Sequence, residues 1–122
     1  MLSKKSKIFI AGHKGMVGSS IMNELNSLNL EVLTAEKNEL DLRDFSLVNN
    51  WFEINKPEVV VIAAAKVGGI HANSSYPVQF LLDNLKIQNN LIEISYKHDV
   101  KKLLFLGSSC IYPKNSPQPI KE

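Results

Sequence analysis

The sequence is short of several features, and each shortage excludes a class of protein. Its 122 residues include a single cysteine, Cys110, so no internal disulfide framework can form, which is typical of a reducing cytoplasm. The histidines His13, His71 and His98 are scattered, and with only one thiol they assemble no metal-ligand cluster. We therefore expect no metal site and a cytoplasmic location.

Excess charge and long apolar runs are also missing. The net charge of +2 is too small to indicate binding to nucleic acid or to an anionic membrane. No apolar stretch approaches the roughly 20 residues that a membrane-spanning helix needs. With 44% hydrophobic and 21% charged residues, the composition is typical of a soluble globular domain without a nucleic-acid or membrane partner.

What the sequence does contain is a regular alternation of strand-like and helix-like segments. The strand-like runs are 7–11, 30–35, 58–63 and 102–107, and the helix-like runs are 16–28, 45–55 and 78–98. We expect Asp44 to cap the second helix, and loops at 65–75 and 113–122. This alternation predicts an α/β fold: a Rossmann-like doubly wound parallel sheet of about four strands in the order 3-2-1-4, with flanking helices.

The predicted sheet is an incomplete one. Its fourth strand, 102–107, lies at an edge although it is apolar on both faces, and a complete doubly wound sheet continues with further strands. We therefore expect a truncated dinucleotide-binding domain over residues 1–112. A loop over 113–122 then leads to a remainder that these residues do not include.

Three glycines follow the first strand with the spacing Gly-x-x-Gly-x-x-Gly and lead into the first helix. Gly12 allows a tight turn, Gly15 lets the backbone approach a phosphate, and Gly18 lets the helix pack close to the strand. The N–H groups and the positive dipole end of the helix then face an anion. The turn predicts a pyrophosphate site, against the plainer interpretation that it only joins a strand to a helix.

Cofactor choice is usually set near the end of the second strand. An acidic side chain there binds a free ribose 2′-hydroxyl, whereas a cation accommodates the 2′-phosphate of NADP. Glu36 and Lys37 stand side by side at this point, and Lys14 lies within the glycine turn. Two lysines against one glutamate favour NADP, with solvated surface charges as the alternative. Asp41 and Leu42 are suited to hold adenine, or Asp41 simply forms a turn.

Small and polar residues follow the last two strands, at the edge where open α/β sheets bind ligands. The alanines of 63–65 leave room for a flat ligand, or they only pack against a helix. Ser108, Ser109 and Cys110 follow the fourth strand, where a hydroxyl is placed to donate to a substrate carbonyl and an activated thiol to exchange a proton. The alternative for a lone cysteine is a small buried hydrophobe.

Three segments stand out as specific motifs. They are Gly-His-Lys-Gly-Met-Val-Gly-Ser at 12–19, Ala-Ala-Ala-Lys-Val-Gly-Gly-Ile at 63–70, and Leu-Leu-Phe-Leu-Gly-Ser-Ser-Cys-Ile-Tyr-Pro-Lys at 103–114. Together they closely resemble the GDP-L-fucose synthases, a family of the extended short-chain dehydrogenase/reductase superfamily. The glycine motif belongs to the superfamily at large, whereas Lys-Val-Gly-Gly and Ser-Ser-Cys-Ile-Tyr-Pro are more particular to this family.

The resemblance implies an NADP(H)-dependent enzyme, both reductase and 3,5-epimerase, that acts on the nucleotide sugar GDP-4-keto-6-deoxymannose and is a homodimer when complete. It implies that Lys14 and Lys37 hold the 2′-phosphate, that Ser108 polarises the sugar C4 carbonyl, and that Cys110 exchanges protons at C3 and C5. The implied cofactor-binding residues are Gly12, His13, Lys14, Gly15, Met16, Val17, Gly18, Lys37, Asp41, Leu42, Ala63, Ala65, Lys66, Leu106, Gly107, Ser108 and Ser109.

The chain departs from the family pattern in one respect. Such enzymes carry a catalytic Tyr-x-x-x-Lys, but none of Tyr76, Tyr96 and Tyr112 is followed four residues later by lysine. We therefore expect the cofactor-binding part of such an enzyme, inactive by itself. The alternatives are a truncated or free-standing nucleotide-binding module without catalysis, and another extended reductase or dehydratase for a different nucleotide sugar.

Overall fold

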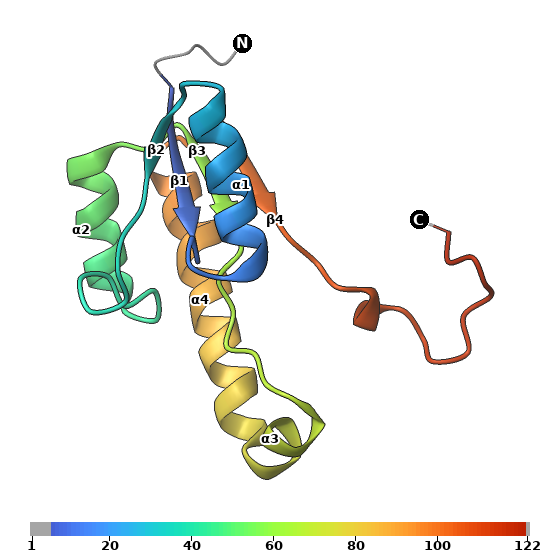
Figure 1. Ribbon diagram of the computed structural model, residues 1–122. Coiled ribbons are helices and arrows are strands. Elements are labelled where there is room, and N and C mark those ends of the chain that lie inside the picture. Colours follow the sequence, from blue (N-terminus) through green and yellow to red (C-terminus); the bar gives the residue numbers. More distant parts are fainter. Residues whose placement is uncertain (1–5, 122) are drawn as a thin grey trace.

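Residues 6–121 are described by a computed structural model, in which four parallel strands form one sheet with helices on both faces (Figure 1). The strands are β1 (Lys7–Ala11), β2 (Glu31–Leu33), β3 (Val59–Ile62) and β4 (Lys102–Phe105). The helices are α1 (Met16–Ser27), α2 (Phe45–Asn55), α3 (Ile70–Ser75), α4 (Pro77–Lys97) and the 3₁₀ helix η1 (Ser109–Ile111). The predicted Rossmann-like α/β fold is confirmed.

The order of the strands differs from the prediction. It is β2-β1-β3-β4, so the predicted order 3-2-1-4 is wrong. β3 pairs with β1 on the side opposite β2, with Val60 beside Phe9. All four residues of β3 are buried, and a central position pairs both edges of this wholly apolar strand. The outer position beside β1 instead holds the three-residue β2, whose Glu31 is exposed.

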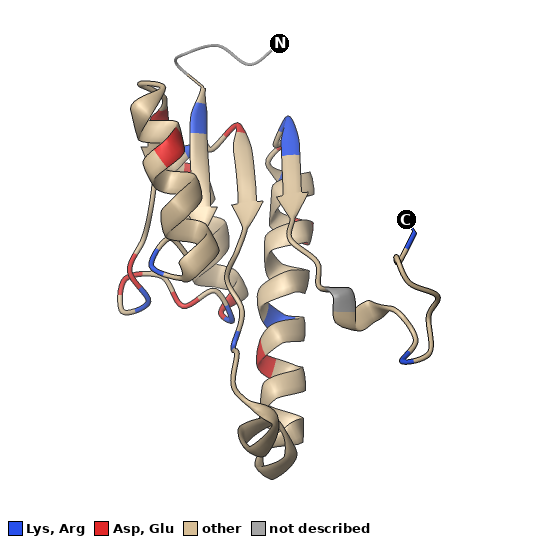
Figure 2. Cartoon of the chain, turned by 45° about the vertical axis from the view of Figure 1, so that its right-hand side comes forward, with Lys and Arg blue, Asp and Glu red and all other residues tan. Residues whose placement is uncertain are grey.

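Two apolar clusters cover the two faces of the sheet, because successive strand residues point to opposite sides. On one face, α1 places Ile21 and Leu25 over Ile8, Val59 and Val61. On the other face α2 and α4 contribute Val48, Phe52, Leu91 and Ile94, and Figure 1 shows α4 behind the sheet while α1 lies in front of it; the strands and the long α4 are seen from another side in Figure 2. The buried residues of this larger cluster are Phe9, Ala11, Leu40, Val48, Phe52, Val60, Ile62, Leu91 and Ile94.

Local signals set the ends of two helices. Asp44 caps α2 as predicted, since its carboxylate accepts a hydrogen bond from the backbone N–H of Leu47 at 3.0 Å. The helix ends at Asn55, and its C-cap residue Lys56 takes a left-handed backbone conformation immediately before Pro57. α4 begins at Pro77, whose missing N–H is no loss in the first turn of a helix.

The predicted loop at 65–75 is wrong in its second half, because this part forms α3. Polar side chains support that short helix: Asn73 Nδ2 donates to the carbonyl oxygens of Gly68 and Gly69, and Ser74 Oγ donates to that of Ile70. The same residue types also stabilise turns, which is why composition alone indicated a loop. Residues 113–121, by contrast, form turns and bends as predicted.

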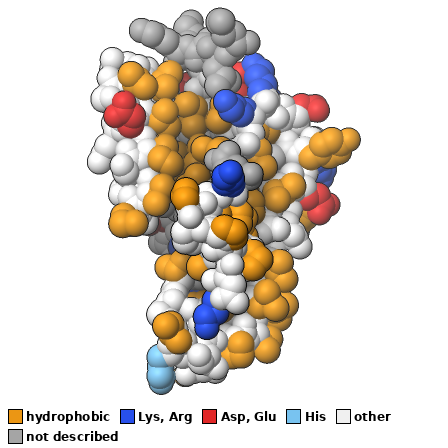
Figure 3. Space-filling view, turned by 90° about the vertical axis from the view of Figure 1, so that its right-hand side faces the viewer, with side chains coloured by type: hydrophobic (Ala, Val, Ile, Leu, Met, Phe, Trp, Pro, Cys, Tyr) orange, Lys and Arg blue, Asp and Glu red, His pale blue; other side chains and the backbone are white. Residues whose placement is uncertain are grey.

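β4 forms the far edge of the sheet, and its apolar side chains are only partly covered. Leu103, Leu104 and Phe105 are 37%, 47% and 46% exposed, although the neighbouring β3 is buried throughout. Figure 3 faces this side of the molecule, and hydrophobic side chains gather across it. The predicted apolar edge strand is therefore present. Within residues 6–121, no helix is long and apolar enough to cross a membrane.

Candidate functional site

A cavity of about 510 Å³ lies at the carboxyl ends of the strands. Its walls are the segments that follow β1, β2 and β3, closed on one side by α4. In open α/β sheets ligands bind at this edge, and the volume is within the usual range of small-molecule pockets. The lining residues are Phe9, Ala11, Gly12, His13, Lys14, Gly15, Ala35, Glu36, Lys37, Leu40, Asp41, Leu42, Arg43, Ala63, Ala64, Ala65, Lys66, Gln79, Asp83 and Ile87.

Two of the three glycines in the turn after β1 are required by packing. Gly12 has a φ of +90°, and a Cβ there would lie 2.7 Å from the backbone of Ala64, just after β3. A Cβ on Gly18 would lie only 2.1 Å from the carbonyl oxygen of Gly12. The turn is therefore packed on one side against the segment that follows β3 and on the other side against α1.

Gly15 differs from these two glycines, because the described residues leave the space beside it nearly open. A Cβ there would meet only the carbonyl oxygen of Gly12, at an ordinary 3.4 Å. Gly15 lines the cavity, and its N–H closes the turn by donating to the Gly12 oxygen at 3.0 Å. Gly15 is thus a glycine of the cavity wall that packing within the described residues does not require.

The start of α1 faces the same turn and carries no competing anion. Gly15 is the N-cap residue without a side-chain cap, and the first turn of α1 contains no acidic residue. The leading N–H groups of a helix have no partner within the helix, and they bind anions together with the helix dipole. The turn and helix start therefore offer donors suited to a pyrophosphate.

Charged side chains gather where the segment after β2 meets the glycine turn. Lys14 Nζ lies 2.6 Å from Glu36 Oε2, and His13 Nε2 lies 3.5 Å from Glu36 Oε1. The hydrogen bond from Lys14 holds the pKa of Glu36 below its usual range, so this carboxyl is ionised at neutral pH. Lys37 lines the cavity beside them.

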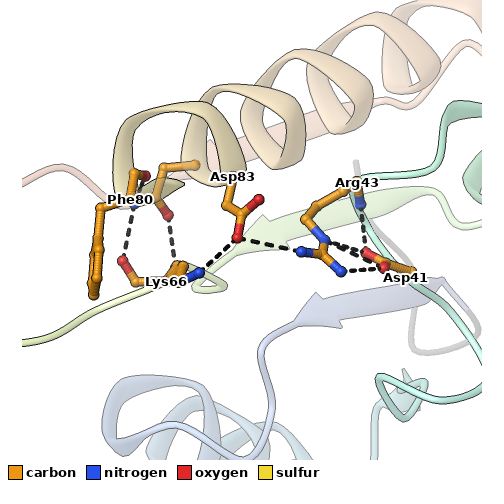
Figure 4. Close-up of polar contacts among 6 residues, drawn as sticks. Asp41, Arg43, Lys66, Phe80 and Asp83 are labelled. Atoms are coloured by element: carbon orange, nitrogen blue, oxygen red, sulfur yellow. Dashed lines mark hydrogen bonds and ion pairs between the residues drawn. The ribbon is translucent and has the colours of Figure 1, made fainter. Parts of the chain in front are cut away.

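A chain of ion pairs crosses the other side of the cavity (Figure 4). Arg43 binds Asp41 with two nitrogens, at 2.9 and 2.7 Å, and reaches Asp83 of α4 at 3.3 Å. Lys66, after β3, lies 2.9 Å from the same Asp83 oxygen. The guanidinium of Arg43 lowers the pKa of Asp41 to about 2, and the hydrogen bond from Lys66 lowers the pKa of Asp83. These ion pairs connect three parts of the protein: the segment after β2, the segment after β3, and α4.

Asn84 completes this connection through backbone groups. Its Oδ1 accepts from the backbone N–H of Lys66 at 2.7 Å, and its Nδ2 donates to the carbonyl oxygens of Lys66 and Phe80, each at 2.9 Å. The amide thus satisfies a donor and an acceptor of a segment that belongs to no strand or helix. It fixes the path of the chain as it leaves β3.

The structure brings together most of the predicted cofactor-binding residues. Those that line the cavity are Gly12, His13, Lys14, Gly15, Lys37, Asp41, Leu42, Ala63, Ala65 and Lys66. Met16, Val17 and Gly18 form the first turn of α1 beside it. The role of each in binding a cofactor stays a prediction.

The predicted residues after β4 lie apart from this cavity wall. Leu106 continues beside β3, since its N–H donates to the oxygen of Ile62 at 3.2 Å, and Gly107 follows in an exposed position. Ser108 and Cys110 are exposed, and the Ser108 hydroxyl accepts from the backbone N–H of Cys110. The side chain of Ser109 is outside the described part of the chain. The proposed catalytic roles here stay predictions.

Sequence reasoning missed Arg43, Asp83 and Asn84. Helix length contained a usable signal: α4 has 21 residues, which span about 30 Å, whereas a four-residue strand spans about 13 Å. A helix much longer than its strand must extend past the sheet, as Figure 1 shows for the N-terminal half of α4. Polar residues in that half, such as Asp83, are therefore candidates to line a site at the carboxyl edge.

The comparisons with known proteins agree with this geometry. The chain is 54% identical over 123 residues to GDP-L-fucose synthase 1 of Arabidopsis thaliana, and 47% identical over 119 residues to GDP-L-fucose synthase of Escherichia coli. These alignments cover 100% and 97% of this chain but only 38% and 37% of the two relatives. The chain therefore spans little more than a third of the length of the curated relatives it matches.

Solved structures show the same fold. A GDP-mannoheptose C4 reductase from Campylobacter jejuni, with NADP bound, superposes with a TM-score of 0.93 at 38% identity, covering 99% of this chain and 38% of that one. Residues 8–122, nearly the whole sequence, match a family described as NAD dependent epimerase/dehydratase. On this match, the chain belongs to the NAD dependent epimerase/dehydratase family.

Proposed function

We propose that this chain is the cofactor-binding part of an NADPH-dependent GDP-4-keto-6-deoxymannose 3,5-epimerase-4-reductase, the enzyme that makes GDP-L-fucose. The observation that carries the proposal is the glycine turn, which packs against the segment just after β3 and contributes Gly12 and Gly15 to the cavity wall. The similarity to GDP-L-fucose synthases over nearly the full length of the chain supports GDP-4-keto-6-deoxymannose as the substrate in this proposal.

The residues around the cavity fit such a cofactor in order along its length. The turn from Gly12 to Gly18 and the start of α1 bind the pyrophosphate, and Lys14 and Lys37 bind the 2′-phosphate. Asp41, kept ionised by Arg43, accepts from the adenine amino group. Leu42 covers the adenine ring beside Asp41. The remaining cofactor-binding residues line the path toward the nicotinamide, and they are Ala63, Ala65, Lys66, Leu106, Gly107, Ser108 and Ser109. When bound, NADPH supplies the hydride.

The chemical steps at the sugar fall to residues after β4. In the proposal Ser108 donates a hydrogen bond to the C4 carbonyl, and Cys110 exchanges the protons at C3 and C5. These 122 residues contain no Tyr-x-x-x-Lys pair to act as the main proton donor. The chain therefore binds the dinucleotide without turnover.

In the cell we place the complete enzyme in the cytoplasm, as a homodimer acting on its nucleotide sugar.

The first experiment titrates the 122-residue chain with NADPH and follows the fluorescence of the reduced nicotinamide. We expect saturable binding, and no NADPH oxidation when GDP-4-keto-6-deoxymannose is added. Oxidation coupled to GDP-L-fucose formation would overturn the view that the chain lacks its main proton donor. Absence of binding by folded protein would overturn the proposal itself.

A hybrid enzyme tests the sugar and the catalytic residues. In it these 122 residues replace the matching segment of the Escherichia coli GDP-L-fucose synthase, with which they share 47% identity. We expect the hybrid to bind NADPH and to form GDP-L-fucose. Ser108→Ala should then lower the rate of reduction, and Cys110→Ser the rate of proton exchange at C3 and C5, without loss of NADPH binding.

A reductase for a different GDP sugar is the second candidate, because the GDP-mannoheptose C4 reductase shares this fold at 38% identity. That enzyme and the GDP-L-fucose synthases are both named for GDP sugars. A hybrid that reduces a GDP-4-keto sugar but shows no Cys110-dependent proton exchange would favour this second candidate.

A further inference from the structure

The carboxylates that line the cavity are all paired with cations. Asp41 and Asp83 are bound by Arg43 and Lys66, on the side nearer α4. Glu36 is bound by Lys14, with His13 on its other oxygen. Among the described residues of the cavity wall, Lys37 is the cation that makes no ion pair. Most cations of the cavity wall are thus already paired with carboxylates, which leaves little positive charge for the 2′-phosphate of NADP(H).

Glu36 is held in place from both ends. Its carboxylate lies 2.6 Å from Lys14 Nζ and 3.5 Å from His13 Nε2. Its backbone N–H donates to Glu39 Oε2 at 3.1 Å. The His13 side chain is only 13% exposed, whereas that of Glu36 is 41% exposed and faces the cavity wall. Glu36 therefore presents an oriented, ionised acceptor rather than a freely moving surface charge.

Glu36 stands where related folds place the residue that binds the ribose of the dinucleotide. It follows β2 and comes 18 residues after Gly18, close to the spacing at which an acidic residue accepts from the 2′-hydroxyl of NAD. A 2′-hydroxyl can donate to Glu36 while Lys14 keeps its present partner. A 2′-phosphate, by contrast, is repelled by the carboxylate and must compete with it for Lys14.

We propose that Glu36 sets the cofactor preference of this site, so that the pocket accepts NAD(H) as well as NADP(H). Its carboxylate binds the 2′-hydroxyl of NAD(H), and NADP(H) binds only after Lys14 has exchanged Glu36 for the 2′-phosphate. The inference rests on the proposed function, since it assumes that the cavity binds a dinucleotide.

The test compares NADH and NADPH affinities of the full chain by calorimetric titration at fixed salt. In the unmodified chain the two affinities should differ by less than about tenfold, because the 2′-phosphate gains Lys14 but must displace Glu36, whereas the 2′-hydroxyl gains one hydrogen bond to Glu36 and displaces nothing. Glu36→Gln keeps the size of the side chain but removes its charge. It should raise NADPH affinity by about tenfold and lower NADH affinity by about fivefold.

Two further variants show whether the effect comes from this contact. Glu53→Gln removes the same charge from the exposed face of α2, away from the cavity lining, and should leave both affinities unchanged. Glu36→Gln frees Lys14 from its ion pair. In a Lys14→Ala background that lysine is absent, so Glu36→Gln should raise NADPH affinity by clearly less than about tenfold.

The outcomes separate this inference from the function on which it rests. If both cofactors bind and Glu36→Gln leaves their affinity ratio unchanged, the inference is wrong while the dinucleotide site stands. The same holds if the unmodified chain binds NADPH more than a hundredfold more tightly than NADH, about 2.7 kcal/mol. If folded protein binds neither cofactor, both proposals are wrong.

Discussion

Two regions at the carboxyl edge of the sheet are organised very differently. Around the cavity, side chains from three loops and α4 are joined by ion pairs and hydrogen bonds, several of them between residues about 17 to 40 positions apart. After β4, the described polar contacts of Ser108 reach only Cys110 and Ile111. Both regions follow parallel strands, so position at this edge does not by itself build a site.

The difference follows from the number of neighbours that each strand has. β1 and β3 lie inside the sheet with helices over both faces, so the segments that leave them meet one another and α4. β4 has one neighbouring strand and exposed side chains, so the segment that leaves it meets little. In this chain the dinucleotide half of the proposed site is preformed, whereas the catalytic half is not.

The largest effect is expected from filling the space between the turn and α1. Gly18→Ala places a methyl group 2.1 Å from a backbone oxygen that cannot move without opening the turn. We expect the free energy of unfolding to fall by about 3 kcal/mol, with NADPH binding lost. Urea denaturation followed by the fluorescence of Trp51, the single tryptophan, whose ring packs 4.3 Å from that of Phe9, measures the loss.

Gly15→Ala is the matched control for that substitution. Its methyl group meets the protein only at 3.4 Å, so stability should change by less than about 1 kcal/mol. Because Gly15 lines the cavity at the proposed pyrophosphate site, an added methyl group should still lower NADPH affinity by at least about tenfold. Equal stability losses for the two alanines would contradict the packing argument.

A smaller effect is expected from removing the link between α4 and the segment after β3. Asn84→Ala deletes three hydrogen bonds to the backbone of Lys66 and Phe80. We expect a loss of about 2 kcal/mol in unfolding free energy and weaker NADPH binding, because partly buried backbone groups lose their partner. Asn89→Ala, an exposed position on the same helix, should cost less than about 0.5 kcal/mol.

The third effect depends on pH. The folded-state pKa of Asp41 is about 2, below its ordinary value of 3.8, because Arg43 binds the carboxylate. A lowered pKa means that the carboxylate adds stability above about pH 4, and that this contribution disappears as the pH falls toward 2. Asp41→Asn should therefore reduce the stability difference between pH 7 and pH 3, by less than about 1 kcal/mol for a pair that is one-third exposed.

Urea denaturation at both pH values measures this difference directly. Glu53→Gln serves as the control, because its exposed carboxylate makes no ion pair among the described residues. An Asp41→Asn chain with the full pH dependence of the original would show that the pair with Arg43 does not stabilise the fold.

How much could be predicted from the sequence depended on the range of the interaction. The Asp44 cap and the spacing of the glycines in the turn each involve residues within about seven positions of one another. Such short-range patterns can be recognised in a sequence, and both were predicted. The pairing of Arg43 with Asp83, 40 positions apart, depends on how α4 lies against the sheet. The length of α4 indicates that its first half extends past the sheet, but no local pattern reports which segment that half meets, and the same reason explains the wrong strand order.

The smallest effect is expected in the region after β4, and it is the sharpest test of the comparison. Ser108→Ala and Cys110→Ser should each change the unfolding free energy of this chain by less than about 0.5 kcal/mol, because both side chains are exposed. The same substitutions should stop or slow catalysis in the hybrid enzyme, where the proposed chemistry is complete. A large stability loss in the isolated chain would show that the region is packed after all. Unchanged stability here, with lost turnover in the hybrid, means that these residues act only where other parts of an enzyme surround them.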